Sequence, residues 1–412
     1  MMQPNLSNIN VTGPVRTAAL NAWQRNGWPG PRVESWRFTK LDRLSARDMS
    51  PASSLSSVTA GDGIAIANSI EAHAIRFVNG IIDQTSLRGL PPGVVNGNLR
   101  DDHDAQLAMM ELAPKNHPVS NLSMAVMSGG LILDVAGDIT KPVMLIFEGD
   151  DVNLSAHPVV LIRFAPMARM VMAEWHQSTV GLSAPLIGID LAAEAHLDFV
   201  KIQAEGSVTS HLAATGVSLA EKAGLAGFSL SVGGEMARLE THVTLAGEGA
   251  DCNLSAIYLG RRRQHHDITT FLNHDIGHCN SDQIIRGVLD DRARGVYQGK
   301  VRVAEGAQKT DGQQMSRALL LSRKAEVDAK PELEIYADDV VCAHGATVGE
   351  LDSTQLFYLK SRGIPDAAAR SMLIEAFLID AIDTVEIDSL SQILRNVAAQ
   401  WMAQTGLTMD GN

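Results

Sequence analysis

The phrases AEA (193–195), AEKA (220–223), GEGA (247–250) and AEGA (304–307) return at nearly constant spacing through the middle of the chain. The residue that ends each phrase belongs to a longer series, in which a small residue opens a new apolar run. That series is Ala168, Ala195, Ala223, Ala250, Gly277 and Ala307, with successive differences of 27, 28, 27, 27 and 30 residues. A fixed period of about 20–50 residues is typical of a stacked repeat, so a solenoid is predicted.

Short apolar runs fill the region from residue 74 to residue 347, and Gly-, Asp- or Ala-rich turns separate them. Runs such as Leu131–Leu133 and Val143–Phe147 indicate β-strands rather than helix pairs. The predicted architecture is therefore mainly β: a parallel β-helix in which each coil buries its apolar face against its neighbours. The small residues are expected at tight corners. Chance recurrence of common Ala, Glu and Gly words is the alternative interpretation.

Helical patterns flank the predicted core. Residues 1–73 are expected to form an N-terminal helical region and linker, because apolar residues between Val15 and Trp23 have helical spacing. Residues 348–412 are expected to form a C-terminal helical region, in which Pro365 suits the first turn of a helix. Both sets of helices are predicted to cover the open edges of the terminal coils.

The composition excludes several classes of protein. The 412 residues are 45% hydrophobic, and their formal net charge of −13 disfavours general nucleic-acid binding. The run Arg261-Arg262-Arg263 is the local exception and is interpreted as a solvated turn or an anchor for acidic groups. Three cysteines cannot form a disulfide framework, and neither a signal peptide nor a membrane span is recognised. A cytoplasmic protein without nucleic-acid or membrane partners is expected.

Two clusters of residues could carry chemistry, whereas the phosphate-binding Walker loop, the Gly-x-Ser-x-Gly elbow and the His-Glu-x-x-His helix are absent from the sequence. Imidazole and thiolate groups at the spacing of the first cluster could bind zinc or iron. Side chains at odd separations point to opposite faces of a strand, so structural histidines are favoured over a metal site. The first cluster consists of His265, His266, Asp267, His274, His278 and Cys279.

The second cluster is the pair Cys342 and His344. The two residues are two positions apart, so they project to the same face of an extended segment, and both can ligate iron. Two ligands do not complete an iron–sulfur cluster, so the others would come from another chain or from a bound thiol. A buried thiol near a structural histidine is the alternative.

The surrounding sequence resembles a known family. KPELEIYADDVVCAHGATVGELD (330–352) and LFYLKSRGI (356–364) are similar to the C-terminal signature of the SufB/SufD family of iron–sulfur cluster assembly proteins. Three further matches are KTDG (309–312), AEVDAKP (325–331) and ESWRFTKL (34–41). SufB-like chains carry a Glu-containing phrase at 344–347, so the sequence resembles the SufD branch more closely.

The resemblance implies a right-handed parallel β-helix flanked by N- and C-terminal α-helical regions. It also implies a non-catalytic scaffold subunit of the SufBCD complex, with a SufB-like partner and a SufC-like ATPase that supplies the ATP site. A transient iron–sulfur cluster would lie at the interface with the SufB-like subunit, and Cys342 and His344 are candidate ligands of it. The C-terminal helix is a candidate for docking the ATPase, with candidate residues Arg370, Leu373, Glu375 and Phe377.

Two alternatives remain open at this point. A SufB-like scaffold that accepts sulfur itself would take up persulfide at Cys252 or Cys279. A carbohydrate-active β-helix enzyme would need paired carboxylates, for which the adjacent Asp338 and Asp339 are poorly placed on a strand. The sequence does not determine whether the isolated chain is a homodimer, whether flavin binds, or which apo-proteins receive the cluster.

Overall fold

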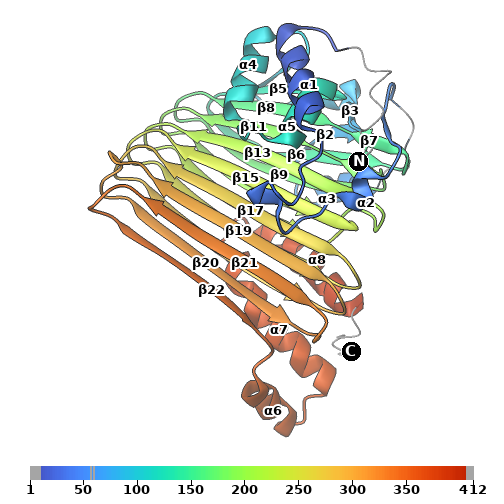
Figure 1. The fold of residues 1–412 in the computed structure, drawn as a ribbon, viewed down its shortest axis with the longest axis vertical. Coiled ribbons are helices and arrows are strands. Elements are labelled where there is room, and N and C mark those ends of the chain that lie inside the picture. The colour runs from blue at the N-terminus through green and yellow to red at the C-terminus, as the bar shows by residue number, and fades with distance from the viewer. Residues whose placement is uncertain (1–10, 56–57, 59–60, 405–412) are drawn as a thin grey trace.

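The computed structural model describes residues 11–55, 58 and 61–404, and its centre is a solenoid of two facing β-sheets (Figure 1). Strands that follow one another along the central part of the chain alternate between the two sheets. Neighbouring strands within each sheet are parallel, except for two antiparallel pairs near the N-terminal end, β2 with β3 and β4 with β5. The predicted parallel β-helix architecture is therefore confirmed.

The first sheet has twelve strands. Its main path, read from the C-terminal end, is β21 (Glu326–Ile335), β19 (Arg294–Val303), β17 (His265–His274), β15 (Met236–Leu245), β13 (Ser210–Leu219), β11 (Leu186–Leu191), β8 (Pro158–Phe164), β5 (Gly129–Val135) and β4 (Val94–Asn98). Three short strands pair beside this path: β1 (Ser50–Pro51), β7 (Leu154–Ala156) and β10 (Leu182–Ser183).

The second sheet has ten strands. In the same direction its order is β22 (Val341–Gly349), β20 (Asp311–Leu320), β18 (Asn280–Leu289), β16 (Asp251–Gly260), β14 (Gly224–Ser231), β12 (His196–Gln203), β9 (Arg169–Ser178), β6 (Asp138–Gly149), β2 (His73–Val78) and β3 (Ile81–Ile82). Each coil thus contributes one long strand to each sheet.

Apolar side chains stack in columns between the sheets, because the parallel register places equivalent residues of successive coils in contact. One column lies along the first sheet and is completely or almost completely buried. Burial of each such side chain contributes about 1.5–3 kcal/mol, which explains how a core with few aromatic residues is stabilised. The members of this column are Ile162, Ile189, Val217, Val243, Leu272 and Val301.

Four of the six predicted corner residues occupy equivalent positions in successive coils. They are fully buried, and the amide that follows each one bonds the corner carbonyl of the coil before it. The amide of His196, for example, donates to the carbonyl of Ala168 at 2.9 Å. The four confirmed corners are Ala168, Ala195, Ala223 and Ala250.

The prediction is wrong for the last two corners. Cys279 and Thr310 hold this position instead of Gly277 and Ala307, because the amides after them bond the preceding corner carbonyl. The turns become longer toward the C-terminus: four residues separate β11 from β12, whereas seven separate β19 from β20. Strand β16, with 10 residues, is also longer than β14, with 8 residues. The corners after Ala250 therefore fall later in the chain than a constant period predicts.

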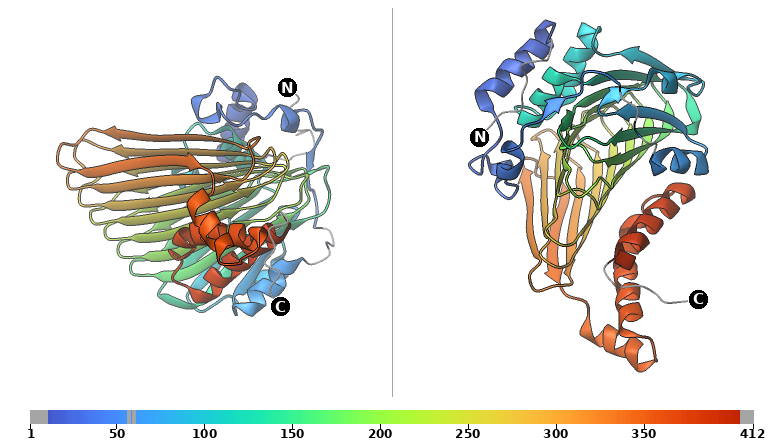
Figure 2. Two further views of the ribbon diagram at one scale, coloured as in Figure 1. Left: turned by 90° about the horizontal axis from the view of Figure 1, so that it is seen from below. Right: turned by 90° about the vertical axis from the view of Figure 1, so that its right-hand side faces the viewer.

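The helices of the N-terminal part are α1 (Pro14–Asn26), η1 (Glu34–Trp36), α2 (Asp42–Ser45), α3 (Asp62–Ser69), η2 (Gln84–Leu87), α4 (His103–Leu112) and α5 (Pro118–Val126). Helices α1, α4 and α5 cover the outer face of the first sheet, whereas α3 packs against Ile146 and Trp175 on the outer face of the second sheet (Figures 1 and 2). Gly216 on β13 allows close approach, since a Cβ atom there would lie 1.9 Å from the carbonyl oxygen of Leu112. Helices α4 and α5, which interrupt the succession of strands, were not predicted from the sequence.

Three helices follow the last strand: α6 (Ser353–Ser361), α7 (Asp366–Ile382) and α8 (Asp388–Gln404). The expectation that they cover the last coil is wrong. Ile374 and Leu394 pack with Ile257 and Val288 on the outer face of the second sheet, so α7 and α8 run back along the solenoid (Figure 2). Burial of the apolar stripes of these helices against that face explains this course. Among the described helices, none is both long and apolar enough to cross a bilayer.

Candidate functional site

The last coil of the solenoid is open. Within the described residues, β22 pairs with β20 alone and β21 pairs with β19 alone, so each of these strands keeps one free edge. Val341 is 65% exposed and Val348 is 46% exposed. Such an edge presents unpaired backbone donors and acceptors, together with apolar side chains, to any chain that can add a strand.

Cys342 and His344 both lie on the terminal strand β22, opposite Gly312 and Gln314 of β20. Those two partner residues are buried, and the Cys342 sulfur lies over Gly312, so both side chains project from the face that lines the solenoid interior. Cys342 is half-buried, which raises the pKa of its thiol, and His344 is exposed at the open end.

The described residues do not include a third His, Cys, Asp or Glu that joins Cys342 and His344 in a metal-binding group. The pair lies at the uncovered end of the solenoid, where a second molecule could supply further ligands. The geometry is consistent with an incomplete site at an interface.

The other two cysteines are in the interior. Cys252 is fully buried, and burial raises the pKa of its thiol far above the usual range. Burial also raises the pKa of Cys279, whose sulfur donates to the carbonyl of Gly247 at 3.2 Å. Thiols with raised pKa values are poor nucleophiles, so neither residue has the environment of a sulfur acceptor.

The first sequence cluster is spread over several environments. His266 and His274 are buried and contact Ser231 and Ser281, whereas His278 is exposed in a turn. Asp267 is a buried ion-pair partner on the other face of β17. These residues therefore serve different structural roles along β17 and the turn after it.

The candidate docking residues on α7 differ in exposure. Arg370 forms an ion pair with Asp366 at 2.7 Å, and Glu375 points to solvent. Leu373 is half-buried. Phe377 is also half-buried, and the guanidinium of Arg286 lies over its ring at 5.6 Å, so this side chain also holds α7 on the solenoid.

Two exposed aromatic residues on α6 were missed by the sequence analysis. Phe357 is 74% exposed and Tyr358 is 55% exposed. The signal was present in the segment LFYLKSRGI, where two adjacent aromatic residues cannot both face a core from one helix. Exposed aromatic side chains next to α7 extend the apolar surface of this region.

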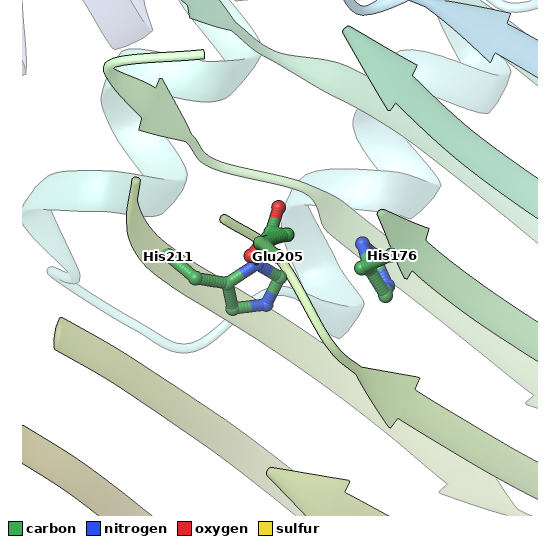
Figure 3. A group of neighbouring side chains, drawn as sticks. All are labelled: His176, Glu205 and His211. Carbon is green, nitrogen blue, oxygen red and sulfur yellow. Dashed lines mark ion pairs between the residues drawn. The ribbon is translucent and has the colours of Figure 1, made fainter. Parts of the chain in front are cut away.

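A second group of titratable side chains, not predicted from the sequence, lies inside the solenoid. His176 on β9, Glu205 just after β12 and His211 on β13 converge near one end of the coils (Figure 3). Oε2 of Glu205 lies 2.8 Å from Nδ1 of His211, and the two imidazole rings meet edge to face with centroids 4.8 Å apart. All three residues are buried.

Charged and polar neighbours surround this group. Oε2 of Glu174 lies 2.7 Å from Nε2 of His176, and the ammonium of Lys201 lies 3.3 Å from the same carboxylate. Burial lowers the pKa of His176. Burial alone would raise the pKa of Glu205, but the adjacent His211 outweighs this effect and lowers it to about 2. The pair Glu174 and His176 stands out in the sequence of β9, but no pattern in the sequence connects it with Glu205 and His211.

A cleft of about 540 Å³ opens beside Glu205, between the turns of the solenoid and α8. Its lining includes Trp175, Trp401 and the run Arg261-Arg262-Arg263. The side chain of Arg261 bonds Gln404 of α8, so the Arg run helps to hold the C-terminal helix as well as to line the cleft. The interpretation of this Arg run as an anchor for acidic groups on a partner remains a prediction.

These features define a β-solenoid protein with an open terminal coil. A family model described as "SUF system FeS cluster assembly, SufBD core domain" matches residues 145–377, which is more than half of the chain. The chain therefore belongs to the SufB/SufD family of iron–sulfur cluster assembly proteins.

Individual relatives agree with this assignment. The chain is 31% identical over 383 residues to the iron–sulfur cluster assembly protein SufD of Escherichia coli (strain K12), which covers 89% of this chain and 88% of that protein. It is 30% identical over 394 residues to an iron–sulfur cluster assembly SufBD family protein of Synechocystis, covering 89% of this chain and 86% of that protein. It is thus a SufD-like member of the family.

Proposed function

We propose that the chain is the SufD-type scaffold subunit of an iron–sulfur cluster assembly complex. It pairs with a SufB-like subunit through the open edges of β21 and β22, and it docks a SufC-like ATPase on α6 and α7. The open terminal coil is the observation that carries the proposal. A solenoid normally needs a cap at each end, and the helices that could cap this end pack elsewhere.

Cys342 and His344 are then placed at the seam between the two scaffold subunits. An iron–sulfur cluster is cargo in this scheme: it is bound transiently by these residues together with thiolates from the SufB-like subunit. The exposed imidazole of His344 is accessible to iron at the open end of the solenoid. The chain contributes no catalytic step, and ATP hydrolysis belongs to the partner. Its buried free cysteines suit the reducing cytosol.

The alternative of a scaffold that accepts sulfur on Cys252 or Cys279 is not favoured, because both thiols are buried and have raised pKa values. A homodimer of the isolated chain would use the same open edges. The SufB-like subunit is the preferred occupant, since a heteromeric seam supplies the thiolate ligands that the pair Cys342 and His344 lacks.

The edge can be blocked without removing the pairing of β22 with β20. The amide of Val341 donates to the carbonyl of Thr310 at 2.9 Å, and backbone groups alternate in direction along a parallel strand. The amide of Ala346 therefore points to the open edge. Ala346→Pro removes this donor, and Ala346→Thr is the matched control because it keeps the amide and favours a strand.

Co-expression with the SufB-like and SufC-like subunits, followed by affinity purification and size determination, tests the proposal. Ala346→Pro should abolish retention of the SufB-like subunit while circular dichroism and the Tm of the free chain stay close to wild type. Ala346→Thr should retain the complex. Normal complex formation by Ala346→Pro would show that the open edge is not the pairing surface. A dimeric free chain that becomes monomeric on this substitution would identify the edge as a contact between two copies as well.

A further inference from the structure

The group His176, Glu205 and His211 offers three metal-ligating atoms that lie within 4.8 Å of one another (Figure 3). The separation of 2.8 Å between Glu205 Oε2 and His211 Nδ1 is close to the roughly 3 Å expected between two ligands that each lie about 2.1 Å from one ion. The residues come from two adjacent coils, and the turn after β12 brings the carboxylate between the two imidazoles. The convergence is therefore a property of the stacked coils.

Several nitrogen atoms in this group lack a hydrogen-bond partner although they are buried. They are Nδ1 of His176 and both ring nitrogens of His211, whose close approach to Glu205 does not have hydrogen-bond alignment. Buried polar atoms are nearly always satisfied, by protein groups, by water or by an ion. Three unsatisfied imidazole nitrogens next to one carboxylate indicate a missing ligand for them.

Neighbouring side chains orient the metal-ligating atoms of His176 and Glu205 through hydrogen bonds, as is usual around a metal site. Glu174 bonds Nε2 of His176, and this interaction leaves Nδ1 as the ring atom with a free lone pair. The carboxylate of Glu205 accepts from Ser178 at 3.1 Å and from Gln203 at 3.1 Å, so its orientation is fixed. Partners of this kind orient metal ligands and are distinct from the ligands themselves.

The charges favour a cation. The group holds two buried carboxylates, Glu174 and Glu205, but only one ammonium, that of Lys201, which pairs with Glu174, so one negative charge is uncompensated when the imidazoles are neutral. In an interior of low dielectric constant an unpaired charge is costly, and a bound dication compensates it. Glu205 also lines the cleft beside α8.

We propose that His176, Glu205 and His211 bind one divalent first-row transition-metal ion, such as Zn²⁺ or Fe²⁺. Two imidazoles and one carboxylate suit these metals, whereas Mg²⁺ and Ca²⁺ prefer oxygen ligands alone. The site is distinct from the pair Cys342 and His344 and does not depend on the proposed partners.

Metal binding by the isolated chain tests this proposal. The purified protein, stripped with EDTA, is dialysed to equilibrium against Zn²⁺, Co²⁺, or Fe²⁺ under anaerobic conditions. The bound metal is then counted by mass spectrometry. The variants are Glu205→Gln, which keeps side-chain volume, and His211→Asn, which replaces the imidazole by a smaller polar side chain; the control is His103→Ala, which removes an exposed imidazole on α4.

Wild type and His103→Ala should bind one equivalent of metal, raise their Tm on binding and give a Co²⁺ absorption spectrum of mixed nitrogen and oxygen ligation. Both site variants should lose at least tenfold in affinity. Unchanged affinity in folded Glu205→Gln and His211→Asn proteins would overturn the assignment.

If the variants do not fold, X-ray absorption of the wild-type zinc form decides: fewer than two imidazole ligands contradicts the site. A wild-type chain that binds no metal would mean that His211 serves only as an ion-pair partner of Glu205. Neither negative result would affect the proposed pairing with SufB-like and SufC-like subunits, because no partner is present in the assay.

Discussion

Acid should destabilise the solenoid through its buried histidines, and His157 and His266 allow the size of the effect to be worked out. Both imidazoles are fully buried, and each has an Nε2 atom without a hydrogen-bond partner. Burial lowers the pKa of His157 from 6.5 to about 3. Burial, with a smaller contribution from His265, lowers the pKa of His266 from 6.5 to about 3. In the folded chain both side chains therefore remain neutral well below pH 6.

The direction of the pH effect on the free energy of unfolding follows from the protons that the unfolded and folded chains bind. In the unfolded chain both imidazoles recover an ordinary pKa near 6.5 and take up protons as the pH falls below that value, whereas the folded chain does not. The contribution of these two histidines to the free energy of unfolding is therefore fully present above about pH 6.5 and is lost progressively as the pH falls toward about 3. Between pH 7 and pH 5 each histidine removes about 2 kcal/mol from the free energy of unfolding, so the pair removes about 4 kcal/mol.

Urea unfolding followed by circular dichroism at pH 7, 6 and 5, in the presence of EDTA, measures this loss. Between pH 7 and pH 5, the free energy of unfolding of the double variant His157→Asn, His266→Asn should fall by about 4 kcal/mol less than that of wild type, whatever the variant's stability at pH 7. His103→Asn, at an exposed position, should follow wild type. An equal loss in the double variant and in wild type would refute the attribution to these two imidazoles.

Three further outcomes are expected from single substitutions. His344→Ala should leave folding and complex formation unchanged yet lower the iron and sulfide content of the complex, and Cys342→Ser should have a milder effect; normal cluster loading in the His344→Ala complex would remove this residue from cluster binding. Gly216→Ala should destabilise the chain by about 3 kcal/mol in urea unfolding, because its Cβ atom would overlap a backbone carbonyl of α4, whereas Gly306→Ala has open space and should be nearly neutral. Glu375→Lys, on the exposed side of α7, should weaken capture of the SufC-like ATPase without changing the Tm, and unaltered capture would move the docking surface elsewhere.

Local patterns in the sequence determined the type of fold. Alternating apolar runs separated by turns define strands, and their recurrence every 27 or 28 residues fixes the length of a coil between Ala168 and Ala250. The spacing of Cys342 and His344 likewise places both on one face of a strand, which the structure confirms. These features depend on residues close together in the chain, so periodicity and residue type suffice to find them.

Features that depend on contacts between several coils could be seen only in the tertiary structure. Strand β16 is longer than β14, and the turn before β20 is longer than the turns before it, so Cys279 and Thr310 hold the corner position; only the register of the sheets reveals this shift. Helices α7 and α8 each carry an apolar stripe, but the stripe alone does not specify the surface against which it packs. Because both helices pack along the second sheet, the last coil stays open.

The group of His176, Glu205 and His211 could not be found from the sequence for the same reason. Their order in the chain gives no regular spacing, and the stacking of two coils, with a turn folded between them, brings the three side chains within a few ångströms. The sequence by itself determined the strands, the coil length and the paired residues of one strand, because those depend on local periodicity. The tertiary structure alone decided which coils, turns and helices meet, because burial and register act between segments far apart in the chain.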